Sequence, residues 1–278
     1  MRTIVDDAVL ALLLEVSGTP KPGNVDRHRE FETLRFEHFL AGSVGAREGL
    51  SIAARGGDVG PAFERAIAGM ADQRGGNTQF GALLGLVPLV RAGATEDLDE
   101  PGISRVVSGT TTWDAACFYR AFDHVDVRVD DPPADLEDLD VRRGSEAIPA
   151  VYDRGLTLGE LLARSADRDG IAREWTTGFE RSRRAASRIV EDEGPIADRA
   201  ARAFLELLAA EPDTLVATEH GEEIAREVTE RAEDLRDGSL EDRERFADDL
   251  VDRGINPGTT ADLTAAALCL ALRWGVSP

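Results

Sequence analysis

Lysine occurs once in this sequence, at Lys21, in a short segment whose residue types could bind a phosphate group or a metal ion. Arginine supplies all the rest of the 32 basic residues. Pro20 and Pro22 flank Lys21 and hold the backbone stiff and extended, because proline fixes its own φ and restricts its predecessor. A lysine ammonium is a compact, strongly hydrated cation, which suits a phosphate or a carboxylate. The pattern favours a functional role for Lys21 over that of a solvated turn residue.

The polar residues around Lys21 could serve as ligands of several kinds. Asp26 could bind a divalent metal ion through oxygen, and Glu15 is a second carboxylate that could do so. Asn24 could orient the metal or a phosphate, although Asn24 and Asp26 could also simply cap a turn. We interpret Lys21 and Asp26 as catalytic. The substrate-binding residues predicted in this segment are Pro22, Gly23, Asn24 and Arg27.

A second segment, residues 74–81, is rich in glycine and opens a predicted helix over 78–92. Free backbone N–H groups at a helix N-terminus favour an anion. The segment lacks the lysine and spacing of a P-loop, and no predicted strand precedes it. An ordinary asparagine cap is therefore the competing interpretation. The predicted substrate-binding residues here are Gly76, Asn77 and Thr78.

Two further segments lie in the last quarter of the chain. Glu219 and His220 could transfer a proton or bind a metal, although the local sequence favours a helix start with solvated carboxylates. Near the C-terminus, a Pro-Gly turn leads into a helix whose first turn carries Asp262. An aspartate there ordinarily interacts with the helix dipole, but Asp262 could also be a catalytic residue or a metal ligand. Its predicted substrate-binding neighbours are Asn256, Gly258 and Thr260.

The charge of the chain excludes several classes of partner. With 53 acidic residues and a formal net charge of −21, nucleic acid and anionic membranes are unlikely partners. The residues are 42% hydrophobic and patterned, which is not typical of disorder. Acidity along the whole length indicates a halophilic protein adapted to a salt-rich cytoplasm. The arginine-rich residues 173–188, with Arg181, Arg183 and Arg184, could hold a phosphate tail.

The cysteines and the N-terminus predict a cytoplasmic protein. Cys117 and Cys269 lie in apolar stretches without metal-ligand or redox spacing, as reduced core residues do. Asp6 and Asp7 interrupt the opening residues, so no targeting signal is evident. The longest late apolar stretch, residues 263–272, is too short to span a bilayer.

Helical periodicity dominates the elements that must position these segments. The apolar residues recur with helical spacing along the whole chain, which predicts one all-α domain over residues 1–278 with roughly ten or more helices. Residues 124–129 alternate like a strand, and the acidic residues 130–140 are the best candidate for a mobile connection. Helices are predicted at roughly 2–17, 35–54, 59–72, 78–92, 110–124, 157–167, 176–192, 196–210, 220–236, 240–251 and 260–274.

Three of these segments, residues 19–26, 76–81 and 256–263, resemble the triphosphoribosyl-dephospho-coenzyme A synthase family in content and order. That family makes the prosthetic-group precursor of citrate lyase and malonate decarboxylase. The resemblance implies an all-α, magnesium-dependent transferase. Such an enzyme takes ATP, displaces adenine from C1 of the ribose, and joins the triphosphoribosyl group to a hydroxyl of 3′-dephospho-coenzyme A.

The resemblance also implies roles for particular residues. Lys21 would meet phosphate, Asp26 and Asp262 would be ligands of magnesium or of a hydroxyl, and Asn24 and Asn77 would position the nucleotide. A ribosyl centre that gains positive charge needs nearby carboxylates, and a departing adenine needs a proton donor or a hydrogen bond. Small molecules are the implied partners, and the sequence leaves a homo-oligomer open.

The sequence departs from the family pattern at Gln79 and Phe80, where bacterial members usually carry His and Lys. This is typical of a divergent, archaeal-type branch, for which the acceptor, and the use of ATP as donor, are open. One alternative is a related ribosyl or phosphoribosyl transferase in another cofactor pathway, such as that of a pterin-type coenzyme. Another is a non-catalytic, nucleotide-binding helical protein.

Overall fold

Helices make up the regular structure of the computed structural model, which describes residues 2–95, 98–132 and 134–278. Within these residues the chain forms sixteen α-helices and two 3₁₀-helices and no strand. The predicted all-α fold class is confirmed. No helix in the described ranges is both long and apolar enough to cross a membrane.

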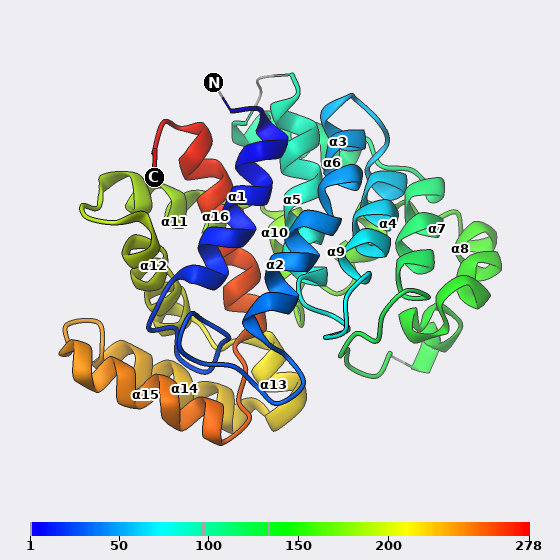
Figure 1. The fold of residues 1–278 in the computed structure, drawn as a ribbon. Coiled ribbons are helices and arrows are strands. Elements are labelled where there is room, and N and C mark those ends of the chain that lie inside the picture. Colours follow the sequence, from blue (N-terminus) through cyan, green and yellow to red (C-terminus); the bar gives the residue numbers. More distant parts are fainter. Residues whose placement is uncertain (1, 96–97, 133) are drawn as a thin grey trace.

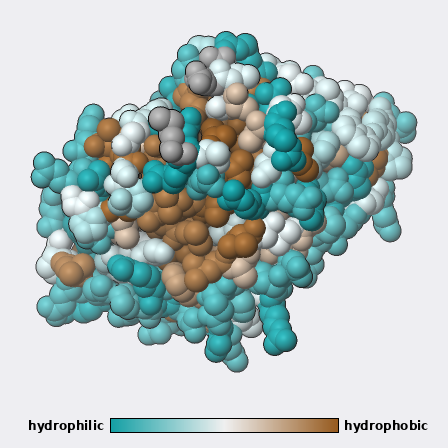
Figure 2. All heavy atoms as spheres, turned by 45° about the horizontal axis from the view of Figure 1, so that its top comes forward, coloured by the Kyte–Doolittle hydropathy of each residue, from teal (hydrophilic) through white to brown (hydrophobic). Residues whose placement is uncertain are grey.

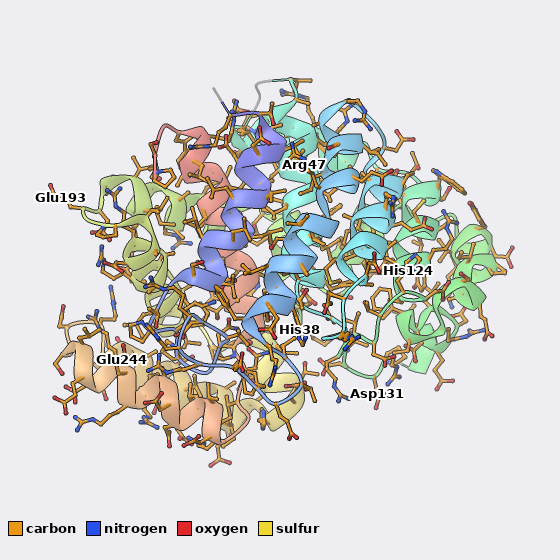
Figure 3. All side chains as sticks on the ribbon, in the orientation of Figure 1. His38, Arg47, His124, Asp131, Glu193 and Glu244 are labelled. Atoms are coloured by element: carbon orange, nitrogen blue, oxygen red, sulfur yellow. The ribbon has the colours of Figure 1, made fainter. Side chains whose placement is uncertain are left out.

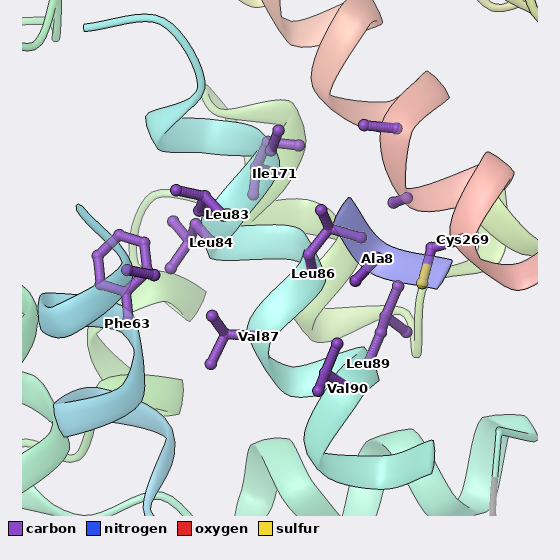
Figure 4. Close-up of a cluster of buried hydrophobic side chains, with 14 of the residues drawn as sticks. Ala8, Phe63, Leu83, Leu84, Leu86, Val87, Leu89, Val90, Ile171 and Cys269 are labelled. Carbon is purple, nitrogen blue, oxygen red and sulfur yellow. The ribbon is translucent and has the colours of Figure 1, made fainter. Parts of the chain in front are cut away.

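Two apolar helices form the centre of the fold. α5 (Phe80–Gly93) and α16 (Gly258–Arg273) each bury twelve residues, because a helix that is apolar on nearly all sides must be enclosed by protein. They pack against each other, and α1 (Ile4–Ser17) lies along α16. Figure 4 shows leucines and valines of α5 in this core, with Phe63, Ile171 and Cys269. Burial removes each such leucine from water, which contributes about 1.5–3 kcal/mol.

Helices from the first part of the chain pack on one side of this centre, and later helices pack on the other side and below it (Figure 1). The first group comprises α2 (Phe36–Gly45), α3 (Arg47–Ala54), α4 (Val59–Met70), α6 (Glu100–Ser108), α7 (Thr112–Ala121), η1 (Ala134–Leu139), η2 (Val141–Ala147), α8 (Ile148–Arg154) and α9 (Leu158–Ala163). The second comprises α11 (Glu180–Glu191), α12 (Ile196–Ala210), α13 (Thr214–His220), α14 (Glu222–Asp234) and α15 (Leu240–Asp252). α10 (Gly170–Thr176) packs against α9 and α5.

Apolar contacts also hold the loop that follows α1. Val16, Val25 and Phe39 form a small buried cluster that fixes residues 18–35 against α1 and α2. A separate cluster, including Phe204, packs α12 against the helices from α13 to α16. The loop that carries Lys21 is thus anchored by hydrophobic contacts on a rigid scaffold.

The predicted helices agree with the structure best where they are long. Residues 196–210 form α12 with those bounds, whereas residues 35–54 divide into α2 and α3 at Ala46. The break follows Gly45, a residue that weakens a helix and here packs against the backbone of Gly69. The short helices α6, α8, α10 and α13 were not predicted, because seven to nine residues carry little periodic signal.

The prediction of a strand at 124–129 is wrong. Residues 126–130 have no regular structure, and the described chain offers no neighbouring strand with which they could pair. Val125 and Val127 instead pack against the helical core. Within residues 130–140, η1 ends at the buried Leu139, whose carbonyl accepts a hydrogen bond from Tyr119, and Pro133 lies outside the described residues. The mobility of this stretch stays a prediction.

Both cysteines are buried and free, as predicted. Burial raises the pKa of each thiol, Cys117 and Cys269, to about 12. A thiol with such a pKa stays protonated and is a poor nucleophile at neutral pH.

Apolar side chains are not confined to the interior. Figure 2 shows them gathered in the middle of one face, with hydrophilic side chains around them. Among the described residues, the large hydrophobic side chains with the most exposed surface are Leu240 of α15, at 65%, and Val44 of α2, at 64%. Patches of this kind often mark sites of association.

Candidate functional site

The three segments singled out in the sequence meet where the N-terminal end of α16 approaches the loop after α1. Asn24 Nδ2 donates a hydrogen bond of 2.8 Å to Asn256 Oδ1, which lies 232 residues away in the chain. Gly23 has a φ of +69°, and a Cβ at this position would collide with the carbonyl oxygen of Ile255. Gly81 likewise leaves room for the Asp262 carboxylate. The first segment is therefore in contact with the third, and so is the second.

Lys21 lies at the bottom of this region and has no exposed surface. Its ammonium forms an ion pair with Glu15, donates a hydrogen bond of 2.9 Å to Asn24 Oδ1, and lies 5.7 Å from the centre of the Phe204 ring. Burial raises the pKa of Glu15, and the charge of Lys21 opposes that rise. A phosphate cannot reach the buried ammonium in this conformation, so direct phosphate contact by Lys21 has no geometric support.

Asp26 holds the loop in place. Its two carboxylate oxygens accept hydrogen bonds from the backbone N–H groups of Lys21, His28 and Arg29 and from the Thr19 hydroxyl, at 2.7–3.2 Å. The Arg29 guanidinium adds a fifth, at 3.1 Å. A carboxylate has about four lone-pair positions, so Asp26 has no oxygen left for a metal ion.

Arg29 extends this support to α15 and was not predicted from the sequence. Its side chain is 8% exposed and pairs with Glu244 and, at 2.6 Å, with Asp248, as well as with Asp26. Figure 3 shows Glu244 beside the loop after α1. The sequence carried no signal for the contact of Arg29 with α15, because Glu244 and Asp248 lie more than 200 residues away.

Asp262 is the fifth residue of α16, just beyond the first turn in which the sequence predicted it, and is only partly buried. The backbone N–H of Ala82, in the first turn of α5, donates to its carboxylate. The pKa of Asp262 is raised well above its usual value, first by burial and then by the charges of Glu15, Asp213 and Asp169. We call these four residues the acidic cluster.

Two members of the acidic cluster are helix caps that the sequence analysis missed. Asp213 caps α13, and its second oxygen accepts hydrogen bonds of 2.7 Å from both the backbone N–H and the hydroxyl of Thr260. Asp169 caps α10 and is exposed, yet the protein around it raises its pKa by desolvation, as in a cleft. An aspartate directly before a helix could have predicted each cap from the sequence. The sequence near these two residues could not predict that they lie beside Asp262.

The two positions that depart from the family pattern have structural roles. Gln79 is buried, and its amide donates to Ser43 Oγ at 2.8 Å, which joins the start of α5 to α2. Phe80 packs edge-on against Phe63, with ring centres 5.1 Å apart. Asn77 accepts a hydrogen bond from the Phe80 N–H at 3.0 Å, so it caps α5. These positions stabilise the helix start and present no cation or proton donor to a ligand.

The remaining predicted residues lie at the margin of the region. Glu219 pairs with Arg128 at 3.6 Å, and His220 contacts the carbonyl of Gly254 at 3.2 Å. Both belong to the exposed end of α13, which fits a solvated helix end. The other marginal residues are Arg27, which is exposed, Gly76, Thr78, and Gly258, which packs against Leu215. Two surface cavities of about 320 and 570 Å³ lie elsewhere, the larger beside Arg47 at the opposite end of the molecule (Figure 3).

Comparison with known proteins gives a consistent result. A family model described as ATP:dephospho-CoA triphosphoribosyl transferase matches residues 1–276. The chain is also similar to a crystal structure from Archaeoglobus fulgidus, of a suggested triphosphoribosyl-dephospho-CoA synthase. The identity is 28% and the TM-score 0.72, over 87% of this chain and 100% of the other. No protein with a curated description matches significantly.

Proposed function

Because the chain belongs to the ATP:dephospho-CoA triphosphoribosyl transferase family, we propose that its active site lies where Glu15, Lys21 and the acidic cluster meet. The enzyme is a transferase that uses ATP and dephospho-CoA and forms triphosphoribosyl-dephospho-CoA and adenine. One observation supports the location above all. Segments from the start, the middle and the end of the chain converge on a single buried ion pair beside carboxylates of raised pKa.

The acidic cluster suits the charge changes of this reaction. The C1–N bond to adenine breaks, a C1–O bond to the acceptor forms, the acceptor hydroxyl loses a proton, and adenine gains one. Positive charge develops at C1, which nearby fixed carboxylates stabilise. Asp262, with its raised pKa, is the residue we assign to accept the hydroxyl proton. Lys21 and Asp26 then act as positioning residues, Lys21 by holding Glu15 and Asp26 by holding the loop.

We propose that magnesium enters with the nucleotide. Among the described residues no three His, Cys, Asp or Glu side chains are grouped closely enough to hold a metal ion. Magnesium at a nucleotide site commonly uses one or two carboxylates together with phosphate oxygens, which it partly neutralises. Asp262 and Asp169 fit that need, since each keeps an oxygen free of protein donors, whereas Asp26 and Glu15 are engaged.

We further propose that the enzyme works in a salt-rich cytoplasm and forms a homo-oligomer. The net charge of −21 supports the first, because salt screens self-repulsion. The apolar area in Figure 2 supports the second. Light scattering in concentrated potassium chloride measures the mass of the particle directly, and a monomer at all concentrations contradicts association.

The reaction is tested by following free adenine from ATP, Mg²⁺ and 3′-dephospho-CoA, at low and at high salt. We expect one adenine per dephospho-CoA consumed and none when the acceptor is omitted. If adenine is released with another acceptor, for example a pterin precursor, and not with dephospho-CoA, the enzyme belongs to a different cofactor pathway. No adenine at either salt concentration contradicts the assigned reaction.

Replacing Gly81 by alanine is expected to lower kcat/KM about 100-fold. The new Cβ would collide with the Asp262 carboxylate, and a displacement near 1 Å at a reacting group has an effect of this size. Gly85→Ala, one turn further along α5, is the matched control, because its Cβ would meet Ala266 and Phe179 at an ordinary 3.8 Å. The control is expected to keep full activity and to gain stability. Equal activity of the two variants in the adenine assay contradicts the role of Asp262.

A further inference from the structure

Arg181, in the first turn of α11, is a nearly buried cation whose guanidinium has no hydrogen-bond partner in the described part of the chain. Its side chain is 11% exposed, and its nearest carboxylate oxygen, on Glu211, lies 3.7 Å away. Among the described residues its guanidinium makes no hydrogen bond, whereas Arg29, exposed to a similar degree, pairs with three carboxylates. Nearly buried guanidinium groups normally use their hydrogen-bond donors, so an arginine whose five donors stay unused can accept an anionic ligand.

The surroundings of Arg181 leave its donors unused. Arg173 already donates to Glu211 at 2.7 Å, so two guanidinium groups share this carboxylate. Burial lowers the pKa of Arg181, whereas the charges of Glu211, Glu174 and Asp213 oppose that effect. Carboxylates therefore balance the charge of Arg181, but none of them in the described residues accepts a hydrogen bond from its guanidinium.

Two threonines, Thr214 and Thr259, lie close to the guanidinium of Arg181 beside Gly170. A Cβ placed on Gly170 would lie 2.6 Å from the Thr259 methyl carbon, 3.5 Å from Thr214 Oγ1 and 3.6 Å from Arg181 Nη1. The two hydroxyls lie 2.9 Å apart and can rotate to donate to a ligand. The next residue, Thr260, is bonded to Asp213 of the acidic cluster. A group bound at Arg181 would therefore lie directly beside the proposed active site.

We propose that Arg181 binds a phosphate group of a substrate, with the Thr214 and Thr259 hydroxyls as additional donors. Its planar fork matches two phosphate oxygens, and its side chain keeps some exposed surface, whereas Lys21 has none. The phosphate belongs to the triphosphate of ATP or to the diphosphate of dephospho-CoA. That identity rests on the proposed function, whereas the phosphate contact itself does not.

The test compares Arg181→Gln with Arg184→Gln and uses inorganic tripolyphosphate as the probe at constant ionic strength. Arg184 lies on the same helix, is exposed, and pairs only with Glu180 at 3.4 Å. We expect Arg181→Gln to weaken tripolyphosphate binding in calorimetry at least 10-fold, because a charged hydrogen bond is lost. Its melting temperature should not fall, since no protein hydrogen bond is removed. Arg184→Gln should bind like the parent, and Arg181→Lys should bind with intermediate affinity.

Steady-state kinetics with the full chain identify the substrate. A raised KM for ATP assigns the phosphate to the donor, and a raised KM for dephospho-CoA assigns it to the acceptor. Unchanged tripolyphosphate binding in Arg181→Gln overturns the proposal, as does no binding by the parent protein. The proposal is also overturned if Arg181→Gln loses much stability, Arg181→Lys keeps the stability of the parent, and tripolyphosphate binding changes in neither variant. Binding that depends on Arg181 in an enzyme that releases no adenine would refute the proposed reaction and keep this inference.

Discussion

Replacing Lys21 by methionine is expected to abolish adenine release and to lower the free energy of unfolding by about 3–5 kcal/mol, because it leaves the buried charge of Glu15 unpaired. The sequence alone predicts loss of activity in a stable protein, as for a lysine that contacts substrate. Its complete burial changes that expectation. Urea unfolding and the adenine assay measure the two effects separately.

The stability loss should depend on pH in a defined direction. Burial raises the pKa of Glu15, and without Lys21 nothing opposes that rise. The native variant therefore takes up a proton that the unfolded chain, with an ordinary pKa of 4.5, does not. The deficit relative to the parent should shrink as the pH falls from 7 toward 4.5. A deficit that is constant over this range contradicts the ion pair as its cause.

The double variant Lys21→Met with Glu15→Gln separates the structural role of Lys21 from its functional one. Removing both charges should recover most of the lost stability, while activity stays lost because the oriented Glu15 carboxylate is gone. Arg65→Gln is the control for loss of an ion pair as such. Its pair with Glu48 is solvent-exposed, so we expect a change below about 1 kcal/mol. Recovery of activity in the double variant would make Lys21 a purely structural residue.

Replacing Asp262 by asparagine is expected to lower kcat by about 10²–10⁴-fold, the usual contribution of a general base, without loss of stability. The pKa of Asp262 is raised in the native state, so ionisation of this carboxylate destabilises the fold. That penalty is absent below the ordinary pKa of 3.8 and grows as the pH rises through the native pKa. The variant should therefore match the parent near pH 3.8 and be at least as stable at pH 7.

Thermal unfolding across this pH range, together with the adenine assay, tests the role of Asp262. Asp252→Asn, on the exposed side of α15, is the matched control and should change neither property measurably. An Asp262→Asn variant that loses stability at pH 7 in proportion to its activity would assign this carboxylate to the structure. Full activity in that variant would remove Asp262 from the mechanism.

The sequence determined the helical architecture and the segments that matter. Periodicity located the longer helices, because the positions i, i+3 and i+4 that form an apolar stripe are local in the chain. Turn and cap residues, which are also local in the chain, identified the three segments. In the structure, a side chain at Gly23 or Gly81 would collide with another segment. The fold class and the family followed from such short-range signals.

Only the tertiary structure decided what each polar side chain does. Lys21 is buried against Glu15, the oxygens of Asp26 are used within the loop, and the Arg181 guanidinium makes no hydrogen bond within the described residues. The sequence presents all three as comparable charged residues. Burial and pairing depend on neighbours such as Asn256 beside Asn24, which are hundreds of residues apart. The free energy of a charged group is set by those neighbours and by its access to water, and only the folded chain fixes both.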